Sequence, residues 1–470
     1  MVMNEKNFDF SWRLLSWEKS MNNLYRVQKR LFKSVCVADF RKALQIQKLI
    51  LNSNSARLLA IREVTQISAT RKIPGIDGKT FLSFTDRFEL NEFVKYNFIN
   101  WEFNKLRKIS LISKNGTIKK FNIPTISDRV WQTLVKFAIQ PANEVNLHPR
   151  NYGFRNGFTI HHLQKLVFLN LSKESFGVQK RVLLLETILV FNISRSKFFL
   201  EKIIAPRGIK LGIFRSFVCG VSPSFNGYGD FENTLDLTSL YANVILNGVE
   251  KIHSSIRFGY SNLFFLKPFD NEINIINKLN MFFDNIGIEC NIKNVQIFST
   301  SEGFNFLDWR FKIDNEGNCF STPSFENYQL FLKRIKYIIN NSNYGSVIKA
   351  TKLYPIIKDW RTYHKFSRMT SSRFSLFFVQ KRAFKIFNKE SKQDKYSTKK
   401  LLKKCFSISK FSTFDTMSSK FNSLPYYGHV TFWIDFLTFN KKISNLNYSI
   451  KFSNEYVCIF CGTTIFDNII

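Results

Sequence analysis

Few side chains in this sequence are grouped so that they could hold a metal ion or act as nucleophiles. Cys458 and Cys461 form a Cys-x-x-Cys pair, which is half of the ligand set of a structural zinc site. His429 or Cys405 could complete the set, but we favour an exposed pair without zinc. No Ser/His/Asp arrangement or P-loop stands out. We therefore predict no resident metal or cofactor. The histidines without metal-ligand partners at a useful spacing are His148, His161, His162 and His253.

Positive charge is the strongest compositional feature of the chain. Its 470 residues include 69 Lys and Arg against 35 Asp and Glu, a formal charge of +34. Such a charge opposes compaction unless a polyanion neutralises it, which favours a nucleic-acid partner over a membrane-surface protein or a merely basic fold. The hydrophobic content of 44% fits a globular protein of several domains. No apolar run reaches the roughly 18 residues of a membrane span, so we predict no membrane partner.

The charge is concentrated between residues 331 and 410. This segment contains 21 Lys and Arg but only three acids, Asp359, Glu390 and Asp394. A basic amphipathic helix is predicted at 331–339. Such a run is usually a solvated helix face, but the aromatic residues between the charges favour an RNA surface. The interleaved aromatic residues are Trp360, Tyr363, Phe374 and Phe378, and for Trp360 a place in the helix core is favoured over base stacking.

The remaining patterns predict an α+β chain. Helical periodicity covers residues 11–65, with breaks near 37 and 53. A hairpin is expected from 106 to 123 around Asn115-Gly116, because this dipeptide favours tight turns. Further helices are expected at 161–171 and 271–285. Strands are expected at 182–185, 292–298 and 303–313.

The stretch from 121 to 162 holds the most distinctive sequence. Pro124 ends an extended segment, and apolar residues then recur at helical spacing from Asp128 until Pro141, where we expect the helix to stop. Residues 151–157 (NYGFRNG) place two glycines around an aromatic residue and an arginine. Such a loop suits either contact with a phosphate backbone or a packed turn, and the residues alone leave both open.

Two motifs in this stretch resemble the fingers region of group II intron reverse transcriptases and maturases. IPTISDRVWQ (123–132) is similar to that family's IPTIxDRAxQ, and NYGFRNGFTIHHL (151–163) to its SYGFRPGRSxHDA. Residues 27–33 (VQKRLFK) and 74–78 (PGIDG) resemble its RNA-contacting N-terminal extension. Residues 353–364 (LYPIIKDWRTYH) closely resemble the LNPIIRGWANYH signature of its thumb, called domain X. Residues 397–406 (STKKLLKKCF) fit the distal basic helix of that thumb, so the resemblance implies a helix there.

The resemblance implies the fold and its divisions. It implies a right-hand polymerase-like arrangement of fingers and palm, with a helical N-terminal extension and a helical basic thumb. The expected divisions are an RNA-binding extension (1–85), degenerate fingers and palm (86–330), the thumb (331–410) and a remnant of a DNA-binding and endonuclease region (411–470). Cys458 and Cys461 resemble the first half of that endonuclease's zinc ligands.

The same resemblance implies that the polymerase chemistry has been lost. The family holds two Mg²⁺ ions with one Asp in the first palm strand and an Asp pair in a Tyr-Ala-Asp-Asp hairpin. Here Glu186 falls at the first position, and Tyr260 and Ser261 fall at the pair. The Gly-rich loop of the family is replaced by 232–236 (ENTLD). We therefore expect a palm kept as a scaffold, without polymerase activity.

The implied function is that of a maturase-like protein that binds a group II or group III intron RNA and assists its splicing. Host splicing factors are candidate partners, and no oligomeric state is assigned. An active reverse transcriptase of a mobile intron and a general RNA chaperone are the alternatives. A plastid, organelle-encoded protein is expected, because 52 Phe with many Lys, Asn and Ile indicates AT-rich coding and the N-terminus lacks a transit-like pattern. The expected RNA contacts are Arg129, Arg155, Lys358, Arg361, Lys399, Lys400, Lys403 and Lys404.

Overall fold

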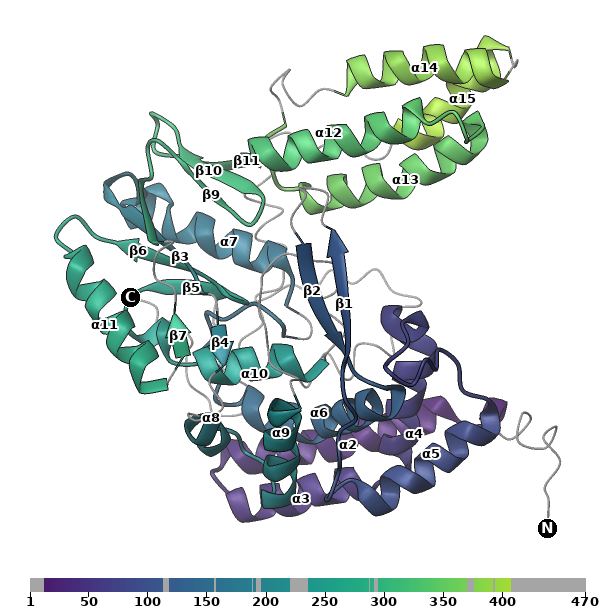
Figure 1. Cartoon of the computed structure of the whole chain (residues 1–470). Helices are drawn as coiled ribbons and strands as arrows, with labels where there is room; N and C mark the ends of the chain where they lie inside the picture. The colour runs from purple at the N-terminus through teal and green to yellow at the C-terminus, as the bar shows by residue number, and fades with distance from the viewer. Residues whose placement is uncertain are drawn as a thin grey trace.

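The computed structural model confirms an α+β protein (Figure 1). It places helices at both ends of the described chain and the larger sheet between them (Figure 1). The described residues form three hydrophobic cores. The first joins the N-terminal helices to one face of the larger sheet, the second covers its other face, and the third lies among the C-terminal helices. The structure describes residues 12–112, 118–155, 158–187, 189–191, 196–219, 236–286, 288–290, 295–369, 376–391 and 394–406.

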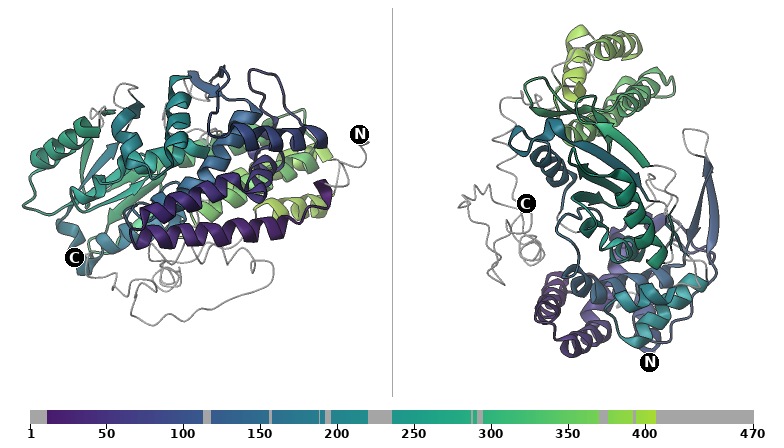
Figure 2. Two further views of the ribbon diagram at one scale, coloured as in Figure 1. Left: turned by 90° about the horizontal axis from the view of Figure 1, so that it is seen from below. Right: turned by 90° about the vertical axis from the view of Figure 1, so that its left-hand side faces the viewer.

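An N-terminal helix group forms one end of the molecule and confirms the helices expected between 11 and 65. Its first two long helices run side by side, as the view from below shows (Figure 2). Ser16, Asp39 and Ser53 begin three of these helices by accepting hydrogen bonds from backbone N–H groups of the first turn. The group consists of α2 (Trp17–Cys36), α3 (Phe40–Asn52), α4 (Asn54–Arg62), α5 (Phe84–Asn97) and α6 (Ile126–Glu144), with the short η1 (Glu63–Ile67) and η2 (Ala69–Lys72) after α4.

The predicted end of α6 at Pro141 is wrong, because the helix continues through the proline to Glu144. A proline inside a helix leaves the carbonyl four residues earlier without its usual donor. Here that carbonyl, of Phe137, accepts a hydrogen bond of 2.8 Å from Gln28 Nε2 on α2. A buried tertiary contact therefore supplies the donor that the proline lacks, and Gln28 gave no sign of this in the sequence.

The predicted hairpin is confirmed as β1 (Arg107–Ile112) and β2 (Ile118–Ile123), paired antiparallel with Arg107 opposite Ile123. Its Asn115-Gly116 turn lies outside the described residues. The two strands form a sheet of their own and extend from the N-terminal helix group toward the C-terminal helices (Figure 1).

The central sheet has the antiparallel order β5 (Ser255–Phe258), β6 (Ser261–Leu266), β3 (Arg181–Glu186) and β8 (Val295–Ser299). Side chains of β3 alternate between two cores, so the run VLLL is buried on both faces. Val182 and Leu184 pack with α7 (Ile160–Asn170), while Leu183 and Leu185 belong to the core of α6, α10 (Asp236–Leu246) and α11 (Glu272–Ile286).

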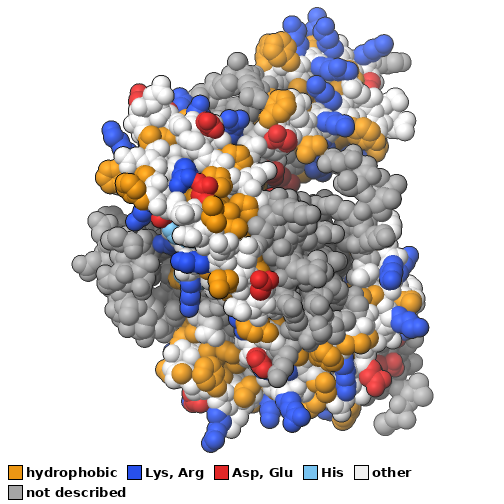
Figure 3. Space-filling model, turned by 60° about the vertical axis from the view of Figure 1, so that its left-hand side comes forward, with side chains coloured by type: hydrophobic (Ala, Val, Ile, Leu, Met, Phe, Trp, Pro, Cys, Tyr) orange, Lys and Arg blue, Asp and Glu red, His pale blue; other side chains and the backbone are white. Residues whose placement is uncertain are grey.

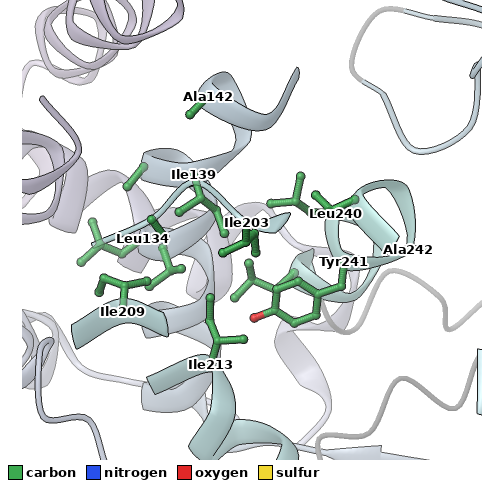
Figure 4. Close-up of a cluster of buried hydrophobic side chains, with 14 of the residues drawn as sticks. Leu134, Ile139, Ala142, Ile203, Ile209, Ile213, Leu240, Tyr241 and Ala242 are labelled. Atoms are coloured by element: carbon green, nitrogen blue, oxygen red, sulfur yellow. The ribbon is translucent and has the colours of Figure 1, made fainter. Parts of the chain in front are cut away.

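Smaller elements complete the core beside α6. Ile203, Ile209 and Ile213 of this region lie against Leu134 and Ile139 of α6, with Tyr241 of α10 beside them (Figure 4). The helices of this region are α8 (Ser196–Lys202) and α9 (Arg207–Val218). The strands β4 (Leu189–Phe191) and β7 (Ile288–Cys290) pair with each other as a separate two-stranded sheet.

The single strand predicted at 303–313 is wrong. The chain forms β9 (Phe304–Phe306), turns at Leu307-Asp308 and returns as β10 (Trp309–Ile313), which pairs with β11 (Cys319–Pro323). Both turn residues have positive φ, 49° and 69°, which usually calls for glycine or asparagine. Two hydrogen bonds from neighbouring segments hold this turn in place. Tyr363 Oη donates to Leu307 O, and Ser324 N donates to Asp308 O at 2.8 Å.

The C-terminal helix group consists of α12 (Phe325–Asn340), α13 (Ser346–Tyr363), α14 (Phe377–Ser391) and α15 (Lys395–Phe406). It has its own hydrophobic core and lies at the opposite end of the molecule from α2 and α3 (Figures 1 and 2). The fully buried Lys349 of α13 pairs with Glu390 of α14 inside the group. The helices expected at 331–339 and 397–406 are confirmed.

Candidate nucleic-acid interface and degenerate polymerase site

The structure brings together the three residues that we aligned with polymerase carboxylates. Glu186 ends β3 directly opposite Ser261, and Tyr260 lies in the turn that joins β5 to β6. Thr187 N donates to Tyr260 O at 3.0 Å, so the backbone closes this end of the sheet. The alignment made from the sequence therefore corresponds to one location in space.

The side chains at this location do not form a pair of metal ligands. Glu186 is exposed, Tyr260 is half-buried beside the Phe154 ring, and Ser261 is buried. A hydroxyl does not supply the negative charge that a carboxylate gives to Mg²⁺. Across the part of the chain that the structure describes, no three His, Cys, Asp or Glu side chains converge to hold a metal ion.

The loop at 151–155 packs against this turn. Tyr152 N donates to Arg257 O at 2.8 Å, and a Cβ on Gly153 would lie only 1.9 Å from Gly259 N. A side chain at 153 would thus collide with backbone. Of the two interpretations left open by the sequence, the packed turn describes this loop. Residues 156 and 157 lie outside the described residues.

Buried polar groups fix the loop to the sheet. Asn151 Nδ2 donates to Asn243 Oδ1 at 3.1 Å, and Asn243 Nδ2 donates to Gly153 O at 3.0 Å. The fully buried Arg257 and Glu250 pair at 2.5 Å. Burial opposes ionisation of Glu250, but Arg257 beside it holds the pKa of this carboxyl below its ordinary value. These groups therefore pair with one another inside the protein.

Two predicted RNA contacts lie in the protein interior. Arg155 is 5% exposed and donates through Nε to Glu144 Oε1 at 2.7 Å. Arg129, also 5% exposed, donates to Ile73 O at 2.9 Å. Both guanidinium groups hold chain segments together in the free protein. Their contact with RNA stays a prediction, and this burial disfavours it. The sequence gave their charge but not the acids and carbonyls that surround them.

Trp360 and Tyr363 of α13 face inward. Trp360 stacks on Phe331 of α12 with ring centroids 4.2 Å apart, which confirms its favoured place in the core. Tyr363 stacks on Trp309 of β10 at 4.7 Å. Arg361 is half-buried, and burial lowers its pKa. The thumb-like signature therefore packs the C-terminal helix group against the β9–β11 sheet.

The other predicted contacts are exposed lysines of the C-terminal helix group. Lys358 lies over the Tyr354 ring on α13, with Nζ 5.7 Å from the ring centroid. Figure 3 shows Lys and Arg gathered over the upper end of the molecule, where this group lies. Four predicted contacts are exposed on α15, whose inner face carries Leu402 and Cys405, and these are Lys399, Lys400, Lys403 and Lys404. Lys395 of the same helix is exposed as well.

The sequence prediction missed a second basic surface, on α14. Lys381, Arg382, Lys385 and Lys389 are exposed there. The helix could have been found from its apolar spacing, because buried Leu376, Val379, Ala383 and Phe387 recur every three or four residues. We call the exposed basic side chains of α14 and α15 the basic helix surface.

Comparison with known proteins decides the family. The chain is 46% identical over 457 residues to Maturase-like protein 1 of Euglena longa, which covers 96% of this chain and 97% of that protein. It is likewise 46% identical over 455 residues to Maturase-like protein 1 of Euglena gracilis, covering 95% and 96%. The chain belongs to the maturase-like protein family.

Two further similarities each cover only part of this maturase-like protein. Residues 12–93, which hold α2 to α4 and most of α5, match the N-terminal domain of reverse transcriptase. Protein YkfC of Escherichia coli K12 is 29% identical over 135 residues, or 28% of this chain and 35% of that protein. The part of the N-terminal helix group up to residue 93 therefore resembles a domain of reverse transcriptases.

Several predictions concern residues outside the described part of this maturase-like protein. They include Cys458, Cys461, His429 and most of the loop at 232–236. Cys405 is buried in the core of the C-terminal helix group, and burial raises its pKa to about 11. Within the described ranges, none of the helices has the length and apolar character of a membrane span.

Proposed function

We propose that this maturase-like protein binds an intron RNA of group II or group III and helps it to fold and splice, without polymerising DNA. The observation that carries the proposal is the basic helix surface. Its lysines and arginines are exposed, whereas Arg155 and Arg257 pair with buried acids. Exposed cations suit a phosphate backbone. The names of the two Euglena relatives support the same function.

The proposed architecture is a right-hand polymerase-like arrangement. We assign residues 1–85 to an RNA-binding extension, 86–330 to fingers and palm, 331–410 to the thumb and 411–470 to a remnant of the endonuclease region. Support comes from the match of residues 12–93 to a reverse transcriptase domain and from the separate core of α12 to α15. The antiparallel order β5-β6-β3-β8 suits a palm.

The proposed mechanism is stabilisation by binding. The basic helix surface neutralises phosphates where RNA helices pack, and so lowers the free energy of the compact intron. The RNA and its Mg²⁺ perform the transesterification. A protein that favours the folded over the misfolded intron by ~3 kcal/mol shifts that equilibrium more than a hundredfold.

The proposed absence of polymerase activity rests on the end of the central sheet. Glu186, Tyr260 and Ser261 stand together where three carboxylates would hold two Mg²⁺ ions. One carboxylate without acidic partners has little affinity for a metal pair. The rival function, an active reverse transcriptase, requires acids from elsewhere in the chain, and primer extension tests it.

We place the protein in the plastid. The support is its coding bias, with 52 Phe among 470 residues and many Lys, Asn and Ile. Detection of its peptides in purified plastids, and not in mitochondria from the same cells, tests this location.

The function is tested by comparing the host intron with an unrelated structured RNA of equal length. We expect the full chain to bind the host intron more tightly at both low and high salt, and to accelerate its splicing at limiting Mg²⁺. Phosphate contacts alone cannot distinguish the two RNAs. Equal affinities that fall together as salt rises, with no effect on splicing, would contradict a maturase and favour the general RNA chaperone.

A further inference from the structure

An exposed aromatic side chain begins the basic face of α14. Phe378 is 78% exposed, although phenylalanine is usually buried. Lys381, Arg382 and Lys385 follow it at positions i+3, i+4 and i+7, which lie on the same side of a helix. The inner side of α14 carries the buried Val379, so the Phe378 ring projects outward among cations.

The same arrangement recurs on α15. Tyr396 is 74% exposed and is followed at i+3, i+4 and i+7 by Lys399, Lys400 and Lys403. Buried Leu402 marks the inner side of this helix. Two consecutive helices therefore present an aromatic ring in the first turn and basic groups along the next two turns, about 10 Å in all.

Both helices are held with these faces outward. Their inner residues share one core with α12 and α13. Thr398 Oγ1 donates to Asn388 Oδ1 at 3.4 Å between α15 and α14, and Lys349 of α13 pairs with Glu390 of α14. The two helices that carry the exposed rings are thus fixed parts of a packed helix group.

We infer that Phe378 and Tyr396 stack on unpaired bases of the bound RNA while the neighbouring cations contact its phosphates. Phe378 also contacts the exposed ring of Phe377, with ring centroids 5.7 Å apart. An apolar protein partner that docked on these rings would still bury the charges of the neighbouring cations, which is costly. An aromatic face beside cations is the arrangement that binds single-stranded nucleic acid. Duplex RNA keeps its bases stacked inside the helix and offers no face to these rings.

This inference rests on the proposed RNA-binding function and specifies which form of RNA the basic helix surface takes. It predicts a preference for loops, bulges or single strands over continuous duplex. The cations serve either form of RNA, because both carry phosphates. The two rings serve only the unpaired form.

The test uses the full chain with Phe378→Leu and Tyr396→Leu combined, because leucine keeps an apolar side chain and the helix but cannot stack as a flat ring. The probes are a short unstructured RNA oligonucleotide and an RNA duplex with the same number of phosphates. We expect the variant to bind the oligonucleotide at least about tenfold more weakly and the duplex nearly as well as the original chain. The salt slope should not change, because no cation is removed.

Phe269→Leu is the matched control, since this phenylalanine is fully exposed between β6 and α11, away from the basic helix surface. It should leave both affinities unchanged. Unaltered oligonucleotide binding by the Phe378 and Tyr396 variant would overturn the stacking inference while leaving the proposed function intact. Failure of the original chain to bind either probe would instead contradict the proposed function.

A direct readout places a fluorophore at one ring. Tyr396→Trp adds an exposed indole, whose fluorescence a stacked base should quench. The measured quantity is the difference in tryptophan fluorescence between this variant and the original chain. We expect the unstructured oligonucleotide to lower this difference and the duplex to leave the difference unchanged. Equal responses to both probes would overturn the inference.

Discussion

The central sheet and the C-terminal helix group use positive charge in opposite ways. Around the sheet, Arg257 pairs with Glu250 and Arg155 with Glu144, in sites that exclude water. On α14 and α15 the cations are exposed along whole helix faces. Paired buried charges specify how chain segments meet, whereas exposed charges remain available to a polyanion. The buried pairs therefore belong to the framework of the protein, whereas the exposed cations of α14 and α15 form the proposed binding surface.

The largest expected effect tests the framework. Arg257→Met leaves Glu250 buried without its cation, which should lower the free energy of unfolding by about 3–5 kcal/mol. Denaturant unfolding of the purified chain measures it. The double change Arg257→Met with Glu250→Leu should recover most of this loss, because no unpaired charge remains. Lys400→Met, on the basic helix surface, should change stability by less than about 0.5 kcal/mol. Similar losses for the two single variants would remove the distinction between the regions.

The next effect concerns the junction between the regions. His364 of this junction is fully buried against Trp360, its Nε2 donates to Asn327 Oδ1 at 3.1 Å, and burial lowers its pKa to about 3. The unfolded chain takes up a proton near pH 6.5, so the stability from neutral His364 is complete above that pH. It falls as the pH drops toward 3, by about 1.4 kcal/mol per pH unit.

His364→Phe keeps an aromatic ring but removes the titration. We expect the free energy of unfolding of the original chain to fall relative to that of the variant as the pH is lowered from 6.5 to 4.5. Burial also lowers the pKa of the nearby His161. This residue is present in both chains, so its pH-dependent contribution to stability largely cancels in the comparison. A difference that does not depend on pH would show that His364 is not held neutral by burial.

The smallest effect is expected at the end of the central sheet. Glu186 is exposed, so Glu186→Ala should change stability by less than about 0.5 kcal/mol and leave intron binding and splicing unaltered. We expect no primer extension from the original chain. Extension that the substitution abolishes would identify Glu186 as a metal ligand and favour the reverse transcriptase.

The sequence predicted elements that depend on local pattern and missed those that depend on distant partners. The helices α2 to α4, the β1–β2 pairing and the buried strand β3 follow from periodicity. The continuation of α6 through Pro141 depends on Gln28, more than a hundred residues away. The turn at Leu307-Asp308 depends on Tyr363 and Ser324 in the same way.

The candidate site shows the same division. The positions of Glu186, Tyr260 and Ser261 could be aligned from motifs, and the structure places them together. The lysines of α15 could be assigned to an exposed face, because charge and helical spacing agree. Arg129 and Arg155 could not be separated from these lysines by residue type, because their burial is decided by Ile73 and Glu144.

We propose that RNA binds through the basic helix surface and not through the exposed charges around the central sheet. The most direct measurement is the salt dependence of intron binding by a variant with Lys399, Lys400, Lys403 and Lys404 all changed to Gln. A matched control changes four exposed lysines around the central sheet and its neighbouring elements, Lys251, Lys267, Lys278 and Lys312.

We expect the first variant to bind the intron more weakly. The slope of log affinity against log salt should become shallower by about 3, because each lost phosphate contact removes roughly 0.7–0.9 from the magnitude of the slope. The control should keep the slope of the original chain. An unchanged slope in the first variant, or an equal fall in the control, would contradict this account.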